Sequence, residues 1–275
     1  MNRKTISEEI TLHGIGLHTG ESCSMTFKPA EDGFISFIRT DIKDCAPIKA
    51  LAENVCSTMR GTNLTNGKEQ VHTVEHVLSA THGLGITDLI VEMDGPEPPI
   101  MDGSSMPYAQ AMEKGGLKEI PSAALILQIN KEVNFKENNI EYSAKPAEKL
   151  TFSFVFLRNH PLIGKQEYTF EYSQQGYLTE IAPARTFGFE EEIAFLRANG
   201  LAKGGRIDNC IIIKKDGFSV PLRFDNEMVR HKILDLIGDL KLTNCVLAPM
   251  HITCICGGHK TNVEFAKLLL KECEK

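Results

Sequence analysis

The sequence predicts an α+β protein assembled from two similar halves. In residues 1–120, strand-like segments precede a helix-like segment and a further strand-like segment, and the same order returns in residues 121–275. The length of 275 residues gives an independent bound, since about 150 residues per domain correspond to one large domain or two small ones. We therefore expect a first α+β domain over 1–120 and a second, similar domain over 121–275.

The first half contains strand-like segments at residues 21–27, 33–38 and 88–93 and helix-like segments near residues 71–81 and 107–113. His18 lies in a glycine-rich stretch at residues 14–20. Because the glycine spacing is not that of a nucleotide-binding loop and no helix clearly follows, we expect a hairpin there. Gly115, Gly116 and Pro121 indicate a linker between the halves.

The second half contains strand-like segments at residues 150–156, 166–172 and 250–256. Helix-like segments cover residues 227–240 and begin again at Asn262, where Thr261 and Glu264 have the spacing of a capping box. Residues 190–216 begin like a helix, turn at two adjacent glycines and continue as a strand at 210–213. We interpret this stretch as an insertion in the second half.

Composition and charge argue against several classes of protein. With 30 Lys and Arg against 36 Asp and Glu, the net charge is −6, and the chain lacks the basic face of a dedicated nucleic-acid-binding protein. No apolar run approaches the roughly 18 residues of a membrane span, and the first residues lack the apolar segment of a signal peptide. The eight cysteines are scattered through a chain large enough to fold without disulfides. We therefore expect a cytoplasmic protein with no membrane span.

The predicted helix at residues 71–81 combines an apolar face with a polar face that contains candidate metal ligands. Apolar residues at positions 71, 74 and 78 follow the i, i+3, i+7 spacing of one helix face. The opposite face presents His72, Glu75, His76 and Ser79. Two histidines with a glutamate are typical of a metal site, although two ordinary surface histidines would give the same pattern.

The predicted helix at residues 227–240 has a similar organisation. Its apolar face consists of Val229, Ile233, Ile237 and Leu240. On another face, His231, Asp235 and Asp239 follow at intervals of four residues. Side chains four residues apart on a helix start about 5–6 Å from one another and can reach one ion. One such pair is more often a surface pair, but two such helices in one chain favour a metal site.

Together the two helices indicate a metal held by three protein ligands. Three ligands leave the fourth position of a tetrahedral zinc ion for water, which is the arrangement of catalytic zinc. A carboxylate beside a ligand then serves as the general base for that water, and Glu75, next to His76, fits this role. The residues alone leave two ways to choose the ligands.

One choice follows from the segment at residues 72–76, which matches the H-x-x-E-H motif of inverted zinc peptidases. In this interpretation His72 and His76 are metal ligands, Glu75 is the base and a distant glutamate is the third ligand. The motif fixes only three positions, so chance matches are common. It also leaves the pairing of His231 with Asp235 unexplained.

The other choice comes from short blocks that occur in order along the chain. They read TVEHVL at 73–78, PIMDGS at 99–104, PARTFG at 183–188, paired glycines and Asp-Asn within 204–209, and RHKILDLIGDL at 230–240. In these blocks, and in the glycine-rich stretch at 14–20, the chain resembles the UDP-3-O-acyl-N-acetylglucosamine deacetylases, the zinc amidases of lipid A biosynthesis. The resemblance extends over residues 4–270.

The resemblance implies a metal site and a base. The ligands would be His76, His231 and Asp235, with Glu75 as the base, and the ion would be Zn²⁺ or Fe²⁺, since two histidines and a carboxylate suit both. The chain departs from the family at His72, where an arginine is usual. This departure implies that His72 is not a ligand and that the peptidase motif is accidental.

The resemblance also implies five further site residues. His259 would act as a cation that stabilises the oxyanion and protonates the leaving amine, and Asp239 would orient and charge it. Thr186 and Lys232 would contact the substrate or the developing oxyanion. Phe187 would pack on the sugar. A positive helix N-terminus behind His259 would oppose the effect of Asp239, and the sequence does not rank the two effects.

The implied fold places helices between two β-sheets, with the insertion at 190–216 lining an acyl-chain passage. The implied reaction is hydrolysis of the acetamide of UDP-3-O-acyl-N-acetylglucosamine to UDP-3-O-acyl-glucosamine and acetate, a committed step of lipid A biosynthesis. A monomer is expected, whose partner is the UDP-linked acylated glucosamine substrate. A non-catalytic protein with a structural metal is a further alternative, and it would require a fourth protein ligand.

Overall fold

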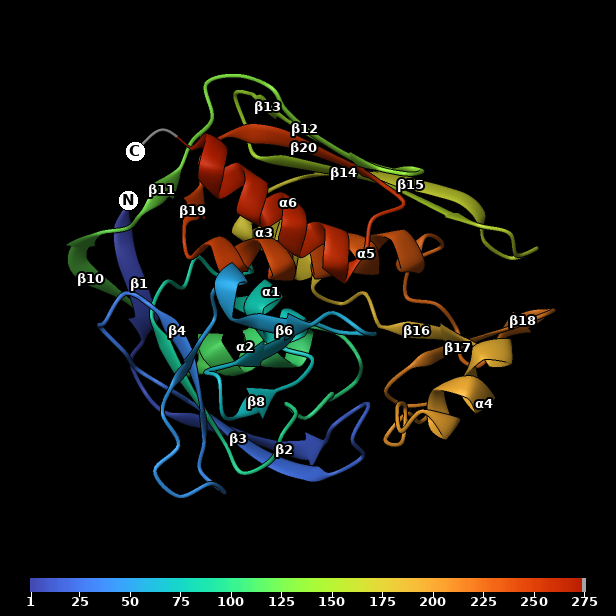
Figure 1. Cartoon of the computed structure of the whole chain (residues 1–275), viewed down its shortest axis with the longest axis horizontal. Helices are drawn as coiled ribbons and strands as arrows, with labels where there is room; N and C mark the ends of the chain where they lie inside the picture. The colour runs from blue at the N-terminus through green and yellow to red at the C-terminus, as the bar shows by residue number, and fades with distance from the viewer. Residues whose placement is uncertain (274–275) are drawn as a thin grey trace.

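A computed structural model of the protein describes residues 1–273 and shows an α+β fold, as the sequence predicts. Two five-stranded sheets form the outer layers, and four helices of nine or fourteen residues lie between them (Figure 1). These helices are α1 (Glu75–Gly83), α2 (Met106–Lys114), α5 (Glu227–Leu240) and α6 (His259–Glu272). Among the described residues, no helix has the length and apolar character needed to cross a membrane.

The two large sheets share one topology. In the first, the order is β2 (Ile10–Ile15), β3 (Ser22–Lys28), β9 (Leu89–Met93), β4 (Ile35–Arg39) and β5 (Ile48–Lys49). In the second, it is β12 (Val133–Glu137), β13 (Ile140–Pro146), β20 (Met250–Ile255), β14 (Thr151–Arg158) and β15 (Gly164–Glu171).

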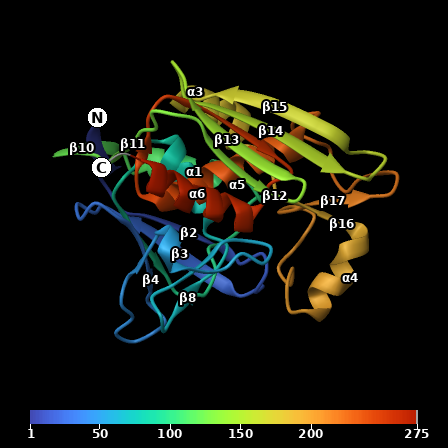
Figure 2. The same cartoon turned by 45° about the horizontal axis from the view of Figure 1, so that its top comes forward.

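In each large sheet the last strand along the chain inserts between the second and the third. Strand β9 runs antiparallel to β3 and parallel to β4, and β20 runs antiparallel to β13 and parallel to β14. In the first half, α1 precedes this last strand and α2 follows it. In the second half, α5 precedes it and α6 follows it. Figure 2 shows the second sheet lying over α5 and α6.

Each half also carries a small three-stranded sheet, whose strands precede α1 in the first half and α5 in the second. In the first half it consists of β6 (Val55–Ser57), β7 (Asn63–Thr65) and β8 (Gln70–Val71). In the second it consists of β16 (Phe187–Phe189), β17 (Ile211–Lys214) and β18 (Gly217–Phe218), with α4 (Glu190–Ala198) between its first two strands. The predicted helix, turn and strand at 190–216 are thus present, and they project from the body of the molecule (Figure 1).

Short elements join these parts. Strands β1 (Asn2–Ile6) and β10 (Leu117–Ala123) pair antiparallel, and β11 (Ile126–Leu127) pairs in parallel with β19 (Val246–Leu247). The remaining turns of helix are η1 (Ala52–Asn54), α3 (Gln174–Gly176), η2 (Tyr177–Ile181) and η3 (Lys241–Thr243). Pro121, predicted in a linker, lies within β10, at the irregularity where the register between β1 and β10 shifts.

Helix α5 is central to the packing. Its predicted apolar residues are fully buried in the core of the second half: Val229, Ile233, Ile237 and Leu240. Gly238 lets α5 approach α1 closely, because a Cβ atom there would lie 2.1 Å from the backbone carbonyl oxygen of Glu75. Such an approach requires glycine. The contact sets the two helices that carry the candidate ligands against each other.

Two helix starts differ from the prediction. Helix α1 begins at Glu75, so His72 lies in the segment between β8 and α1 and shares no helix face with His76. The cause is local, since Thr73 has a φ of +52°, which interrupts helical geometry. Helix α6 begins at His259, and Thr261 lies within its first turn, where its hydroxyl accepts a hydrogen bond from the Gly258 N–H.

Candidate active site

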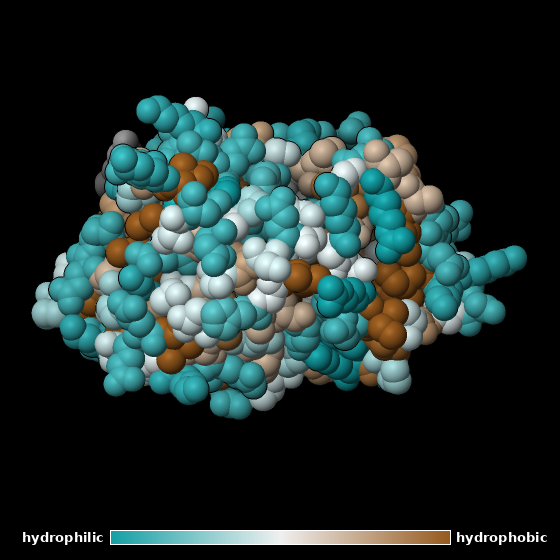
Figure 3. Space-filling view, turned by 90° about the horizontal axis from the view of Figure 1, so that it is seen from below, coloured by the Kyte–Doolittle hydropathy of each residue, from teal (hydrophilic) through white to brown (hydrophobic). Residues whose placement is uncertain are grey.

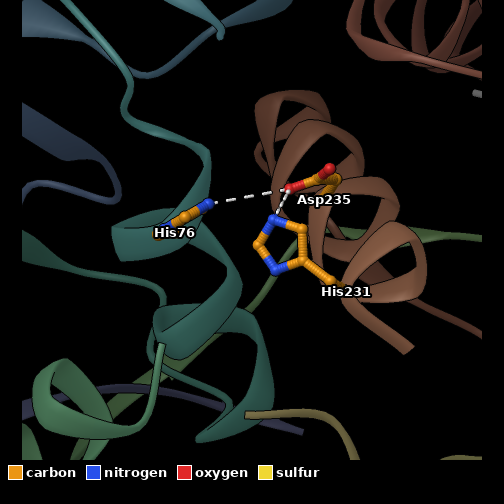
Figure 4. A group of neighbouring side chains, drawn as sticks. All are labelled: His76, His231 and Asp235. Atoms are coloured by element: carbon orange, nitrogen blue, oxygen red, sulfur yellow. Dashed lines mark ion pairs between the residues drawn. The ribbon is translucent and has the colours of Figure 1, made fainter. Parts of the chain in front are cut away.

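Three candidate ligands from two helices meet between the halves of the molecule. His76 lies in the first turn of α1, while His231 and Asp235 lie one turn apart on α5 (Figure 4). The Oδ1 atom of Asp235 is 3.3 Å from Nε2 of His231 and 3.7 Å from Nε2 of His76. One donor atom from each residue lies within 4.8 Å of the others.

The environment of these three residues fits a divalent cation. All three are buried, and Asp235 Oδ1 has no hydrogen-bond partner although it lies between two imidazole nitrogens. The backbone carbonyl of Ala184 accepts a hydrogen bond of 3.1 Å from His231 Nδ1, which leaves the lone pair of Nε2 facing Asp235. Burial is the main cause that lowers the pKa of His76 to about 3, and the charge of nearby His231 is the second cause. Neutral imidazoles around an unpartnered carboxylate oxygen are a typical donor set for Zn²⁺ or Fe²⁺.

Glu75 lies beside this cluster with its carboxylate held in place. It is 2% exposed, and its Oε2 accepts a hydrogen bond of 2.8 Å from the backbone N–H of Thr62. Burial raises the pKa of Glu75 to about 8, while the charge of His259 opposes the rise. A cation on the adjacent ligands would favour the ionised form of Glu75. Its other oxygen, Oε1, lies 3.8 Å from Nε2 of His259.

His259 is held in one orientation by Asp239. Its Nδ1 donates a hydrogen bond of 2.9 Å to Oδ2 of Asp239, so that Nε2 is directed toward Glu75. Burial lowers the pKa of His259, but the carboxylates of Asp239 and Glu75 more than offset it, and the pKa is raised to about 9. His259 is also the first residue of α6, a position where the helix N-terminus disfavours the charged form.

Lys232, Thr186 and Phe187 line the same cavity as His259 and the candidate ligands. The Nζ atom of Lys232 lies 2.8 Å from Oδ2 of Asp235 and 5.5 Å from the centre of the Phe187 ring. The Thr186 backbone is fixed by hydrogen bonds to Gly103 and Ile211, and its side chain lines the same cavity as the ligands. The structure therefore brings all nine site residues of the deacetylase interpretation together: eight line one cavity, and Asp239 is hydrogen-bonded to His259 behind them.

Two adjoining cavities open at this place. The first, which we call the reaction cavity, has a volume of about 210 Å³ and is lined by the ligands, Glu75, His259, Lys232, Thr186 and Phe187. The second, the insertion cavity, has about 110 Å³ and is lined mainly by apolar residues of the insertion, including Ile193, Leu196 and Ile212. Both share the walls formed by Leu17, Arg60, Thr186 and Phe187. Apolar side chains also reach the surface over the insertion, where Phe195 and Ile207 are exposed (Figure 3).

His72 and His18 lie outside the ligand cluster. The His72 side chain does not line the reaction cavity, and its backbone N–H donates to the carbonyl of Pro96. Burial lowers the pKa of His72. His18 lies in the predicted hairpin between β2 and β3 and lines the insertion cavity, where its Nε2 is 3.0 Å from the carbonyl oxygen of Arg60. The described structure groups His76 with His231 and Asp235 and not with His72, which argues against the inverted-peptidase ligand set.

Sequence analysis missed several residues that build the site. Thr62 donates to both Glu75 and Asp239, and Asn262 donates to Asp239. Glu97 is 1% exposed and accepts hydrogen bonds from the hairpin at 18–19 and from Thr73. None of these residues belongs to a periodic pattern, since each acts through contacts between segments far apart in the sequence.

Comparisons with known proteins agree with this geometry. Residues 3–271 match the profile of the family described as LpxC: UDP-3-O-acyl N-acetylglycosamine deacetylase. The UDP-3-O-acyl-N-acetylglucosamine deacetylase of Campylobacter lari is 40% identical over 275 residues, covering 99% of this chain and 92% of the relative. Proteins of the same name from Nitratiruptor sp. and Helicobacter hepaticus are 38% and 39% identical, covering 99% of this chain and 92% and 91% of their own length. The chain belongs to the UDP-3-O-acyl N-acetylglycosamine deacetylase family.

Proposed function

We propose that the protein hydrolyses the acetamide of UDP-3-O-acyl-N-acetylglucosamine, releasing acetate and UDP-3-O-acyl-glucosamine in lipid A biosynthesis. The observation that carries the proposal is the arrangement of a base, Glu75, and a protonated histidine, His259, on one cavity with the three candidate metal ligands. Amide hydrolysis needs a nucleophile, stabilisation of the developing oxyanion and a proton for the leaving amine. Each need has a separate residue in the reaction cavity.

The metal in this proposal is Zn²⁺, with Fe²⁺ as the alternative that the same donors accept. His76, His231 and Asp235 would hold it, and three protein ligands leave a position for water. When bound, the ion would lower the pKa of that water toward about 7 and polarise the acetyl carbonyl. The absence of a fourth protein donor in this cluster of described residues supports a catalytic rather than a structural metal.

The proton transfers are assigned to Glu75 and His259. Glu75 Oε1 takes the proton of the attacking water, since Oε2 is already occupied by the Thr62 N–H. His259 carries its mobile proton on Nε2, because Nδ1–H remains bonded to Asp239. Its raised pKa, about 9, keeps it cationic at neutral pH and able to protonate the leaving amine. Asp239 thus acts as a positioning residue.

Lys232 and Thr186 are assigned to the carbonyl oxygen of the acetyl group. The Lys232 ammonium lies between Asp235 and the Phe187 ring and contributes positive charge to the cavity wall. The Thr186 hydroxyl is the neutral donor. We assign the ring of Phe187 to packing on the sugar, and the insertion cavity to the start of the acyl chain, since its lining is largely apolar.

The organisation of the chain supports this proposal. We propose two duplicated domains divided near residue 120, since both large sheets have the same strand order, and the reaction cavity takes residues from both halves. One chain supplies every assigned residue, which supports a monomer as the working unit. Seven cysteines, at positions 23, 45, 56, 210, 245, 254 and 256, are free thiols, which supports a reducing, cytoplasmic location.

Acetate release from UDP-3-O-acyl-N-acetylglucosamine by the metal-loaded protein tests the proposed function. We expect hydrolysis by the wild type and loss of at least about 10²-fold in kcat for Glu75→Gln or His259→Gln, consistent with loss of general acid–base catalysis. The matched control is Glu92→Gln, on β9, where the carboxylate pairs with Lys28 away from the cavity. Failure of the wild type to release acetate, or equal rates for all four proteins, would refute the proposal.

A further inference from the structure

A third cavity lies apart from the reaction cavity, where the end of α1 meets η3 and β19. It has a volume of about 290 Å³, shares no lining residue with the other two cavities and has mostly apolar walls that include Leu150, Val246, Leu247 and Pro249. His82 and Lys241 also line it, together with Lys149, Tyr172 and Cys245. We call it the Lys241 cavity. None of its residues has a part in the proposed hydrolysis.

Lys241 is a buried cation without a counter-ion. It is 4% exposed, and its Nζ makes no ion pair or hydrogen bond with any residue of the described part of the chain. The carboxylate of Asp88 is near enough for its charge to favour the charged form of Lys241. Asp88, however, already accepts hydrogen bonds from Arg3 and from the backbone N–H of Gly33. Burial lowers the pKa of Lys241 to about 8. An unpaired buried ammonium is costly, and its exposure to the cavity gives access to a partner from outside the chain.

His82 places a neutral donor near this cation. It is 8% exposed and lies at the last turn of α1, edge-on to the rings of Phe152 and Tyr172. Burial is the main cause that lowers the pKa of His82 to about 3, and the charge of Lys241 is the second cause. The ring therefore stays neutral and keeps one N–H. Within residues 1–273, no side chain or backbone group accepts a hydrogen bond from that N–H.

These features select a class of ligand. The other lysine at the cavity, Lys149, is exposed and already pairs with Glu171 at 2.6 Å, which leaves Lys241 as the cation that lacks a partner among the described lining residues. One cation and one neutral donor match a monoanion, and the apolar walls match a short hydrocarbon chain. The volume, about 290 Å³, is just below the range for drug-sized ligands, about 300–1,000 Å³, so the cavity suits a small ligand.

We propose that the Lys241 cavity is a second ligand site that takes a small carboxylate with a short apolar chain. The carboxylate would bond to Lys241 Nζ and the His82 ring, and the chain would pack against Leu150, Val246 and Leu247. Charge-assisted hydrogen bonds of this kind are among the stronger ones in proteins.

Calorimetric titration of the metal-loaded protein with sodium hexanoate tests this proposal, with hexan-1-ol and hexylammonium chloride as matched ligands. We expect hexanoate to bind the wild type at least about tenfold more tightly than either, since a hydrogen bond to a charged group contributes more than a neutral one. Hexanoate that binds no better than hexanol, or a preference for hexylammonium, would overturn the proposal whatever the variants show.

Three variants locate the site. Lys241→Met keeps the length of the side chain and removes the charge, and it should weaken hexanoate binding by about tenfold or more. Lys241→Arg keeps the charge and should retain binding. Lys149→Met removes a lysine of the same cavity whose charge is already paired with Glu171, so this variant should bind hexanoate as the wild type does. Unchanged binding to Lys241→Met would show that hexanoate binds elsewhere, for example at the metal or in the insertion cavity, and would refute the proposed site.

Discussion

Asp239 gives His259 both its orientation and its charge. The carboxylate is fully buried and bonds at one oxygen to Thr62 and at the other to His259 and Asn262. Its position on α5 is one turn beyond Asp235, so one helix face would supply both the proposed ligand and the residue that positions the proposed acid.

Asp239→Asn should move the alkaline limb of the pH–kcat profile to lower pH. Loss of the carboxylate removes the interaction that favours the charged form of His259, so the pKa of this histidine falls from about 9 and the cation is lost earlier as pH rises. The measurement is kcat for acetate release from pH 6 to about 10. Asp41→Asn, where the carboxylate pairs with Arg39 on the surface, should leave the limb in place. An unshifted limb in Asp239→Asn would show that another group controls it.

Lys232→Met should lower kcat/KM by about 10²-fold without emptying the metal site, because removal of one oxyanion donor has an effect of this size. The ammonium contacts Asp235 Oδ2, whereas the candidate ligand atom is Oδ1. The measurement combines kinetics with metal analysis of the same sample. Lys260→Met, which removes an exposed partner of Glu137, serves as the control. A variant of Lys232 with wild-type kcat/KM would exclude the assigned role.

At the scale of single residues, the sequence predicts those that follow helical spacing and misses those that do not. His231, Asp235 and Asp239 are visible as a stripe at intervals of four. Glu97 and Thr62 are invisible, because a buried carboxylate in a turn or a threonine before a strand has no distinctive pattern. Their contacts join the hairpin, the segment before α1 and α5, and only the folded chain brings these together.

At the scale of elements, the crossing of α1 and α5 determines the geometry of the metal site. Helix α5 is predictable over its whole length, 227–240, because its apolar residues are periodic and all of them are buried. Helix α1 is less predictable, since residues 71–74 continue the helical pattern but Thr73 has a positive φ. The segment before α1 is bonded instead to Asn63, Glu97 and Pro96, and these contacts override its local helical preference.

Gly238→Ala should destabilise the fold and weaken metal binding together. The added methyl group would lie 2.1 Å from the Glu75 carbonyl oxygen, which forces α1 away from α5 and separates His76 from Asp235. We expect a loss of about 1–3 kcal/mol in the free energy of unfolding, as for other overpacked cores. Urea denaturation and metal titration measure the two effects. Gly217→Ala, where no atom lies within 4 Å of the added group, is the control.

Leu196→Trp should discriminate among acyl lengths. Leu196 lies on α4, is 7% exposed and lines the insertion cavity, so a larger side chain reduces the space there. We expect kcat/KM to fall more for substrates with long 3-O-acyl chains than for those with short ones. Competition between two acyl lengths measures the ratio directly. Phe195→Trp, on the same helix but 67% exposed, is the matched control. An equal loss for both lengths would place the acyl chain elsewhere.

At the scale of the whole molecule, the proposed metal site joins the two halves. One ligand comes from α1, which packs in the core of the first half, and two come from α5, which packs in the core of the second. The α+β class and the repeated order of elements are predictable from sequence, and the sheets confirm the class. The short strands that tie the halves together, such as β1 with β10, escape prediction because two to seven residues carry little periodic signal.

Removal of the metal should lower the thermal stability of the whole chain. A ligand that binds only the folded state contributes about 4 kcal/mol at a thousandfold excess over its Kd, and here it cross-links the two halves. We expect the chelated protein to unfold at lower temperature than the loaded protein. Asp235→Ala should unfold at the same temperature with and without chelator. A wild type that is insensitive to chelator would contradict a metal held by ligands from both halves.

The central claim is that His76, His231 and Asp235, and not His72, form a catalytic metal site. Its most direct test is metal content measured with acetate release from UDP-3-O-acyl-N-acetylglucosamine, in the wild type, Asp235→Ala and His72→Arg. We predict that the wild type and His72→Arg both hold about one ion per chain and release acetate, while Asp235→Ala loses both properties. An empty site in His72→Arg, or full metal and activity in Asp235→Ala, would contradict the claim.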